Sequence, residues 1–164
     1  MPPPAQPSLN ATYRRGQRNT FTVTGVADKN GVLLIGANPR KEAPVLNARI
    51  RERWRSGNFK IGLIGEKADL TYDYTYLGAG PETLADFVKH KKAQLKKQIW
   101  LIGQGALARK DSAAILSMFA KSVISVGGVA DGWNGFSVLH TAASRVGALD
   151  LGAVPGDGGL TAAQ

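Results

Sequence analysis

The chain has 164 residues, of which 43% are hydrophobic and none is cysteine, and its net charge is +9. This length suits one domain or part of a larger one. The lack of cysteine excludes disulfides, thiolate zinc sites and cysteine-ligated iron–sulfur clusters within the chain. No stretch reaches the ~18 continuous apolar residues that a membrane helix needs, so we expect no direct membrane insertion.

The positive charge is concentrated in two segments. Residues 39–60 hold seven arginines and lysines against Glu42 and Glu52, and residues 89–97 hold five lysines and no acid. The sequence contains no DNA- or RNA-binding motif, and no aromatic residues interleave with the lysines. We therefore expect no nucleic-acid binding and interpret these segments as solvated or partner-facing surface.

The first residues resemble a transit peptide in charge, because they contain no acid and carry Arg14, Arg15 and Arg18. The prolines in the first seven residues oppose a continuous amphipathic helix, however. We expect a disordered basic leader over residues 1–26, with organelle targeting as the alternative. Residues 153–164 are expected to form a flexible tail.

Residues 27–152 contain three similar units, each with a short aliphatic strand, a glycine-containing loop and a helical stretch. The strands are predicted near residues 32–36, 59–64 and 98–102. Continuous aliphatic strands suit a sheet that is covered on both faces, and alternation with helices implies parallel pairing. The predicted fold is α/β, a three-stranded parallel, doubly wound, Rossmann-like unit.

The first helix is predicted from about Pro44, where proline is tolerated at the first helical position. Leu46, Ile50 and Trp54 recur at a spacing of four residues and share one face, which is expected to pack on the sheet. Arg51 and Arg55 then lie on the opposite side.

Three more helices follow. One begins near residues 80–82 with Leu84, Phe87 and Val88 on its inner face. The next runs from about Asp111, a plausible N-cap, to Val123, and its expected inner residues are Ala114, Ile115, Met118 and Phe119. The last is predicted over residues 134–146, with Trp133 and Asn134 capping and packing it.

Two loops are candidate ligand sites, because ligands of open α/β sheets bind at the carboxyl ends of strands. Gly36 and Asn38 follow the first strand, and Gly103 and Gly105 follow the third. Glycines in such loops let the backbone approach a phosphate. The third glycine of a dinucleotide-binding motif is missing, and the favoured interpretation is a tight strand-to-helix turn.

The remaining polar candidates favour structural roles. His90 is expected to be exposed, and His140 is expected to be a structural histidine in the last helix, since no nucleophile elbow precedes any serine. The aspartates and tyrosines of residues 69–74 are expected to anchor a loop by hydrogen bonds, with paired-carboxylate chemistry as the alternative. No catalytic residue and no metal site are predicted.

Three stretches resemble the large iron–sulfur subunit, of the 75 kDa type, of NADH:quinone oxidoreductase, respiratory complex I. They are residues 33–51, beginning LLIGANPR, residues 69–78, beginning DLTYDY, and residues 133–152, which include LHTAASRV. They cover about residues 32–160 in the expected order. Residues 36–39 alone are shared with molybdopterin oxidoreductases generally.

The resemblance implies a partial molybdopterin-oxidoreductase-like domain that acts as a non-catalytic scaffold in the path of electrons from NADH to quinone. It also implies no cofactor in this chain, because the family's iron–sulfur clusters lie in an amino-terminal region that is missing here. The chain then looks like a fragment, a split subunit or a truncated product. The alternative is a true molybdopterin-binding oxidoreductase that uses Gly36, Asn38, Gly103 and Gly105.

The same resemblance implies partners among the other hydrophilic-arm subunits of complex I. The expected location is the cytoplasmic face of the bacterial inner membrane, or the matrix side of the mitochondrial inner membrane. The guanidinium group of arginine is weakly hydrated and can form two parallel hydrogen bonds with a carboxylate, which suits protein interfaces. The predicted interface residues are Arg51, Arg55, Lys41 and Lys60.

Overall fold

The computed structural model describes residues 30–91, 98–131, 133–140, 142, 145–153, 156 and 159. Their main element is a parallel five-stranded sheet with strand order β3-β2-β1-β4-β7. The strands are β1 (Gly31–Ile35), β2 (Lys60–Ile64), β3 (Thr75–Gly78), β4 (Ile99–Ile102) and β7 (Phe136–Val138). A separate antiparallel pair joins β5 (Val129–Ala130) to β6 (Trp133–Asn134). The predicted leader lies outside the described residues, as does most of the predicted tail.

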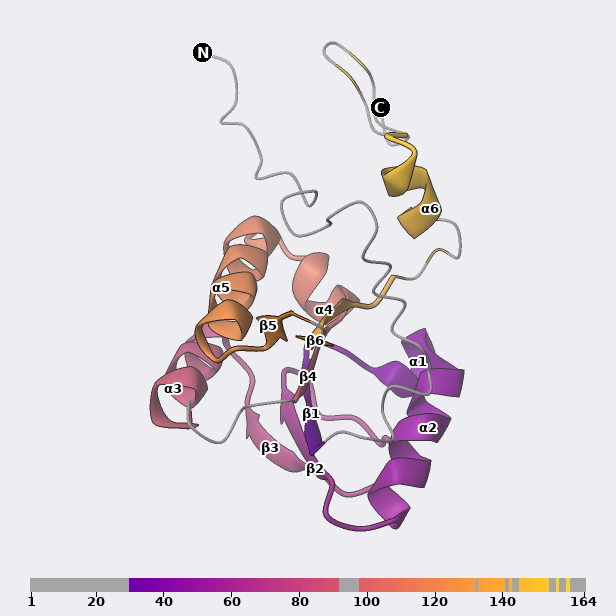
Figure 1. Ribbon diagram of the computed structural model, residues 1–164, viewed down its shortest axis with the longest axis vertical. Helices are drawn as coiled ribbons and strands as arrows, with labels where there is room; N and C mark the ends of the chain where they lie inside the picture. Colours follow the sequence, from indigo (N-terminus) through magenta and orange to yellow (C-terminus); the bar gives the residue numbers. More distant parts are fainter. Residues whose placement is uncertain are drawn as a thin grey trace.

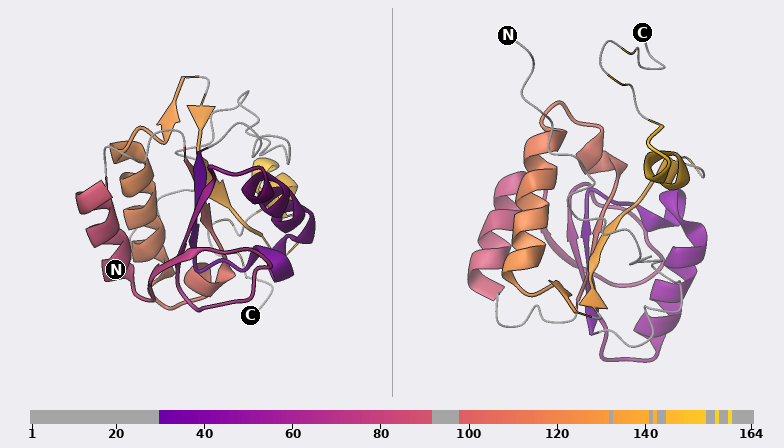
Figure 2. Two further views of the ribbon diagram at one scale, coloured as in Figure 1. Left: turned by 90° about the horizontal axis from the view of Figure 1, so that it is seen from below. Right: turned by 45° about the horizontal axis from the view of Figure 1, so that its top comes forward.

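Helices cover both faces of the sheet. On one face lie α1 (Pro39–Glu42) and α2 (Pro44–Arg55), and on the other lie α3 (Pro81–Lys91) and α5 (Ser112–Ser125) (Figures 1 and 2). The short helix α4 (Gln104–Leu107) follows β4, and α6 (Arg145–Asp150) comes near the end of the chain.

The two helical layers are separated by the alternation of side chains along the strands. Val32 and Leu34 of β1 pack in one cluster with Ile50 of α2. Leu33 of β1 belongs to the opposite cluster, which contains Phe119 of α5. Because successive side chains of a strand point to opposite faces, a continuous aliphatic run can fill both cores at once.

The three predicted strands are confirmed, and they pair in parallel as expected. The strands β3 and β7 at the two edges of the sheet were not predicted. Both are only partly buried, with Thr75 and Tyr76 of β3 exposed and the three residues of β7 half-buried. Such edge strands lack the aliphatic run that marks the central strands.

The helix predicted over residues 134–146 is wrong. Trp133 and Asn134 form β6 and cap no helix, and residues 136–138 form β7, so that a helix begins only at Arg145. The backbone amide of Trp100 donates to the carbonyl of Gly135, and the amide of Leu139 donates to Ile102. Residues 135–139 thus hydrogen-bond along β4, and Gly135 weakens a helical alternative.

Two details of the helices also differ from expectation. Leu46 and Ile50 are buried and Trp54 is half-buried, as predicted, but Ala114 of α5 is exposed. Asp111 occupies the N-cap position of α5 without a side-chain capping bond, because its carboxylate instead receives two hydrogen bonds from Arg109.

We expect Ile50→Ala to lower the free energy of unfolding by about 2–5 kcal/mol, because Ile50 is fully buried against the sheet and its loss leaves a cavity. Val45→Ala on the same helix should change it by less than about 0.5 kcal/mol, since Val45 is 66% exposed. Urea titrations of the two variants provide the measurement. Equal midpoints would contradict this account of the core.

Candidate functional site

The loops after β1 and β4 lie at the same edge of the sheet. β1 leads to β2 and β3 on one side, whereas β4 and β7 lie on the other, so the direction of strand order reverses between β1 and β4. The carboxyl ends of strands at such a reversal form the usual ligand crevice of an open α/β sheet. The four candidate residues of the two loops, Gly36, Asn38, Gly103 and Gly105, are therefore brought together.

The glycines of these loops face each other's backbone. A Cβ atom placed on Gly103 would lie 2.6 Å from the Cα atom of Ala37, and one on Gly105 would lie 2.8 Å from the carbonyl oxygen of Gly36. Gly36 has a φ of +52°, which glycine adopts without strain. What approaches these glycines closely is the other loop of the same chain.

A carboxylate links the two loops. The side chain of Glu42 accepts hydrogen bonds from the backbone amides of Asn38, at 2.5 Å, and of Gln104, at 3.1 Å. The side-chain amide of Gln104 donates in turn to the carbonyl of Leu139 at 3.0 Å. The ends of β1, β4 and β7 are thereby connected. Glu42 was not predicted as a site residue. Its only signal in the sequence is that an acidic residue stands four positions after Asn38.

Two buried polar atoms at this edge have no hydrogen-bond partner within the described part of the chain. They are Oδ1 of Asn38 and Nδ1 of His140. His140 follows β7 and does not lie in a helix, contrary to expectation. Burial, together with the charge of Arg145, lowers the pKa of His140. His90 is exposed, as predicted.

The loop over residues 69–74 is anchored by hydrogen bonds, as predicted. The Tyr72 hydroxyl donates to Oδ1 of the buried Asn47 at 2.8 Å, and Nδ2 of Asn47 donates to the carbonyl of Leu70 at 3.3 Å. Asp69 receives hydrogen bonds from the amide of Thr71 and from Arg40, and these two contacts lower the pKa of Asp69. The Asp69 carboxylate thus stabilises the turn of this loop through its bond to the Thr71 amide.

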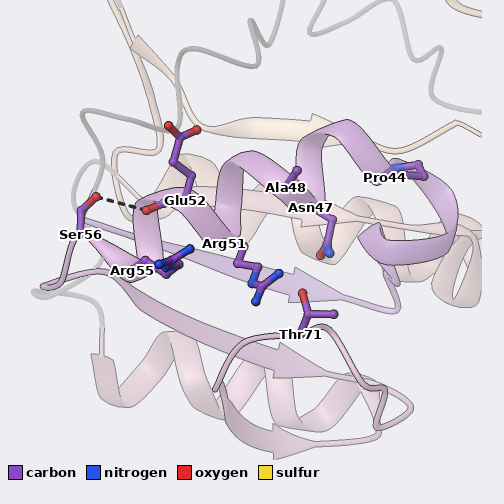
Figure 3. Close-up of a pocket in the computed structure, with 8 residues that line it drawn as sticks. All are labelled: Pro44, Asn47, Ala48, Arg51, Glu52, Arg55, Ser56 and Thr71. Carbon is purple, nitrogen blue, oxygen red and sulfur yellow. Dashed lines mark hydrogen bonds between the residues drawn. The ribbon is translucent and has the colours of Figure 1, made fainter.

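This loop and α2 border an open groove (Figure 3). Arg51 and Arg55 extend from the helix on the side of Thr71, whereas Glu52 points away from it. Both arginines are exposed, and within the described residues no ion pair involves either of them. The lining residues are Pro44, Asn47, Ala48, Arg51, Glu52, Arg55, Ser56 and Thr71.

The other two predicted interface residues do not line the groove. Lys41 lies in α1, before the start of α2, and Lys60 begins β2, after the end of α2. Both are exposed. Arg51 and Arg55 lie one turn apart on α2, so the structure brings them together. The two lysines lie toward opposite ends of this helix, which spans about 18 Å.

Within the described residues, no group of three or more histidine, aspartate or glutamate side chains is placed to hold a metal ion. In the same part of the chain, no helix combines the length and the apolar character needed to cross a membrane.

The family model for molybdopterin oxidoreductase matches residues 2–164. The chain belongs to the molybdopterin oxidoreductase family. Among curated proteins this family member is similar to the NADH-quinone oxidoreductase G subunit of Rickettsia bellii, with 39% identity over 150 residues, which cover 88% of the chain and 22% of that protein. It is also similar to the mitochondrial NADH-ubiquinone oxidoreductase 78 kDa subunit of Candida albicans, with 39% identity over 136 residues, 80% of the chain and 19% of that protein.

A third relative is the mitochondrial NADH dehydrogenase [ubiquinone] iron-sulfur protein 1 of Solanum tuberosum, with 33% identity over 152 residues, 89% of the chain and 21% of that protein. The chain therefore spans about a fifth of the length of the curated relatives that it matches. The resemblance to the large complex I subunit that the motifs indicated is confirmed.

The family name raises the question of whether this edge of the sheet fits the phosphate of a molybdopterin. Such a group would need space between the two loops and backbone amides that can donate to it. In this structure Gly36 of the loop after β1 contacts residues 103–106 of the loop after β4, which fills that space. The Glu42 carboxylate already accepts hydrogen bonds from the amides of Asn38 and Gln104. The residues present at this edge do not fit that group.

Stability should decline above the ordinary tyrosine pKa of 10.0, because burial raises the pKa of Tyr72. The unfolded chain then loses this proton while the folded chain retains it, which favours unfolding. Tyr72→Phe should flatten the decline and cost about 1–3 kcal/mol at pH 7, since Asn47 loses its hydrogen-bond donor. The measurement is urea unfolding from pH 7 to 11.

Tyr76→Phe is the matched control, since Tyr76 is 38% exposed. It should follow the wild-type pH dependence. If the two variants show the same decline, burial of the Tyr72 hydroxyl is not its source.

Proposed function

We propose that the chain is a non-catalytic scaffold segment of the large iron–sulfur subunit of NADH-quinone oxidoreductase, within the machinery that passes electrons from NADH to quinone. The observation that carries this proposal is the similarity to such subunits over 80–89% of the chain. The chain itself holds no cluster in this proposal, a view supported by its lack of cysteine. No catalytic activity is expected from the chain alone.

The proposed partners are other hydrophilic-arm subunits of the same complex. The assembly would place the chain at the cytoplasmic face of a bacterial inner membrane or at the matrix side of the mitochondrial one. The proposed location rests on relatives that include one bacterial protein and two proteins named as mitochondrial. Membrane association would come through partners and not through a membrane-spanning segment of this chain.

The proposed docking surface is the groove with Arg51 and Arg55, and its occupant is an acidic segment of a neighbouring subunit. Like charges one helical turn apart destabilise a helix by about 0.2–0.5 kcal/mol. This repulsion opposes the close placement of the two arginines within the chain, whereas carboxylates of a partner would be attracted to both. Guanidinium groups can bind such carboxylates through paired hydrogen bonds.

Charge reversal of Arg51→Glu together with Arg55→Glu should reduce co-purification of the other complex subunits about tenfold or more, because like charges then face each other across the interface. The melting temperature of the chain should stay nearly unchanged. The measurement is affinity purification of the tagged chain from its native host, followed by quantitative mass spectrometry.

The matched control is Lys110→Glu with Lys121→Glu, which changes the net charge equally at two exposed residues, one of them in α5 on the other side of the sheet. We expect full recovery of partners from it. Equal recovery from both double variants would support a merely solubilising surface. DNA binding at physiological salt that the arginine reversal abolishes would support a nucleic-acid function instead.

The purified native chain should contain neither molybdenum nor pterin in stoichiometric amount. The reason is the filled space between the loops after β1 and β4. Elemental analysis and fluorescence of the extracted pterin are the measurements. Stoichiometric molybdenum would support the alternative of a molybdopterin-binding enzyme domain.

A further inference from the structure

Glu42 is placed where an anionic ligand of this type of sheet would be held. Its two carboxylate oxygens accept from the amide of Asn38, which precedes α1, and from the amide of Gln104, the first residue of α4. These loops follow the two strands between which the strand order reverses. We infer that Glu42 is a built-in anion that closes this crevice and keeps phosphate-bearing ligands out of it.

The electrostatics of the position support this role. The amides of Asn38 and Gln104 precede the first hydrogen bonds within α1 and α4, so each needs an acceptor outside its own helix. A single carboxylate from α1 accepts from one amide of each loop, although Glu42 and Gln104 are 62 residues apart in the sequence. A phosphate would have to displace the Glu42 carboxylate, which is also negatively charged and is already hydrogen-bonded.

The packing of the backbone supports the same role. A Cβ atom on Gly36 would lie 2.4 Å from the amide nitrogen of Ala106, and one on Gly103 would lie 2.6 Å from the Cα atom of Ala37. The loops thus touch each other directly, and the carboxylate holds them there. The glycines that suggested a phosphate loop in the sequence instead allow two loops of one chain to meet.

The inference goes beyond the proposed function, because it assigns a role to one residue and holds whether or not the chain assembles with other subunits. It is tested on the full chain with Glu42→Gln. The substitution keeps the size of the side chain but turns one acceptor oxygen into a donor that faces a backbone amide. Glu66→Gln is the matched control, since Glu66 is exposed shortly after the end of β2.

The readout is hydrogen exchange at individual amides, measured by NMR. In Glu42→Gln, the protection of the Asn38 or the Gln104 amide should fall about tenfold or more, because a hydrogen bond to a charged acceptor is lost. Amides within β1 should keep their protection, and Glu66→Gln should leave all of these amides unchanged. Equal protection of Asn38 and Gln104 in the two variants would overturn the inference.

A second measurement needs only the wild-type chain, in case the variant does not fold. Inorganic pyrophosphate at millimolar concentration should leave the amide resonances of Gly36, Asn38, Gly103 and Gly105 in place. Saturable shifts at these amides would show that the crevice is open, and would also overturn the inference. Neither experiment depends on partner subunits, so failure of the docking proposal would leave its result intact.

Discussion

The fold depends on the burial of β1 from every side. All five residues of this strand are buried, β2 and β4 pair with its two edges, and helices cover both its faces. Each aliphatic side chain removed from water contributes about 1.5–3 kcal/mol. Its backbone amides and carbonyls lie away from water and are satisfied through the neighbouring strands. A strand this hydrophobic therefore has to be central, with α2 packed on one side and α5 on the other.

The position of β1 determines what happens at the carboxyl edge of the sheet. Because β2 and β4 both run parallel to β1, the loops after β1 and β4 emerge side by side. Two backbones that emerge so close together need glycine at the points of closest approach, and Gly36, Gly103 and Gly105 lie at these points. The amides of these loops then need an acceptor, and Glu42 provides one for Asn38 and Gln104.

The sequence predicted the parts of the fold whose signal is local. An uninterrupted aliphatic run such as residues 32–35 identifies a strand buried on both faces, and the spacing of Leu46 and Ile50 identifies the inner face of α2. The edge strand β7 could not be found in this way, since its half-buried residues are held by pairing with β4. The local pattern of residues 134–146 predicts a helix instead. It contains no sign of the strand, because the hydrogen-bonding partner of Gly135, Trp100, is distant in the sequence.

The candidate site shows the same limit. The four loop residues were predicted from the position of glycines after strands, a rule that concerns the sheet edge alone. Whether such an edge receives a ligand or a side chain of its own chain depends on contacts between distant segments, such as that of Glu42 with Gln104. The exposure of Arg51 and Arg55 was easier to anticipate, since helical spacing alone placed them away from the core.

Buried contacts define the shape of the groove beside α2. Asn47, on the inner side of α2, binds the hydroxyl of Tyr72 and the carbonyl of Leu70. These bonds hold the loop that contributes Thr71 to the groove lined by Arg51 and Arg55. The position of this loop beside the groove is thus fixed by a buried polar pair. A preformed surface reduces the entropy lost on association, so an acidic segment that binds Arg51 and Arg55 would not have to order the loop as well.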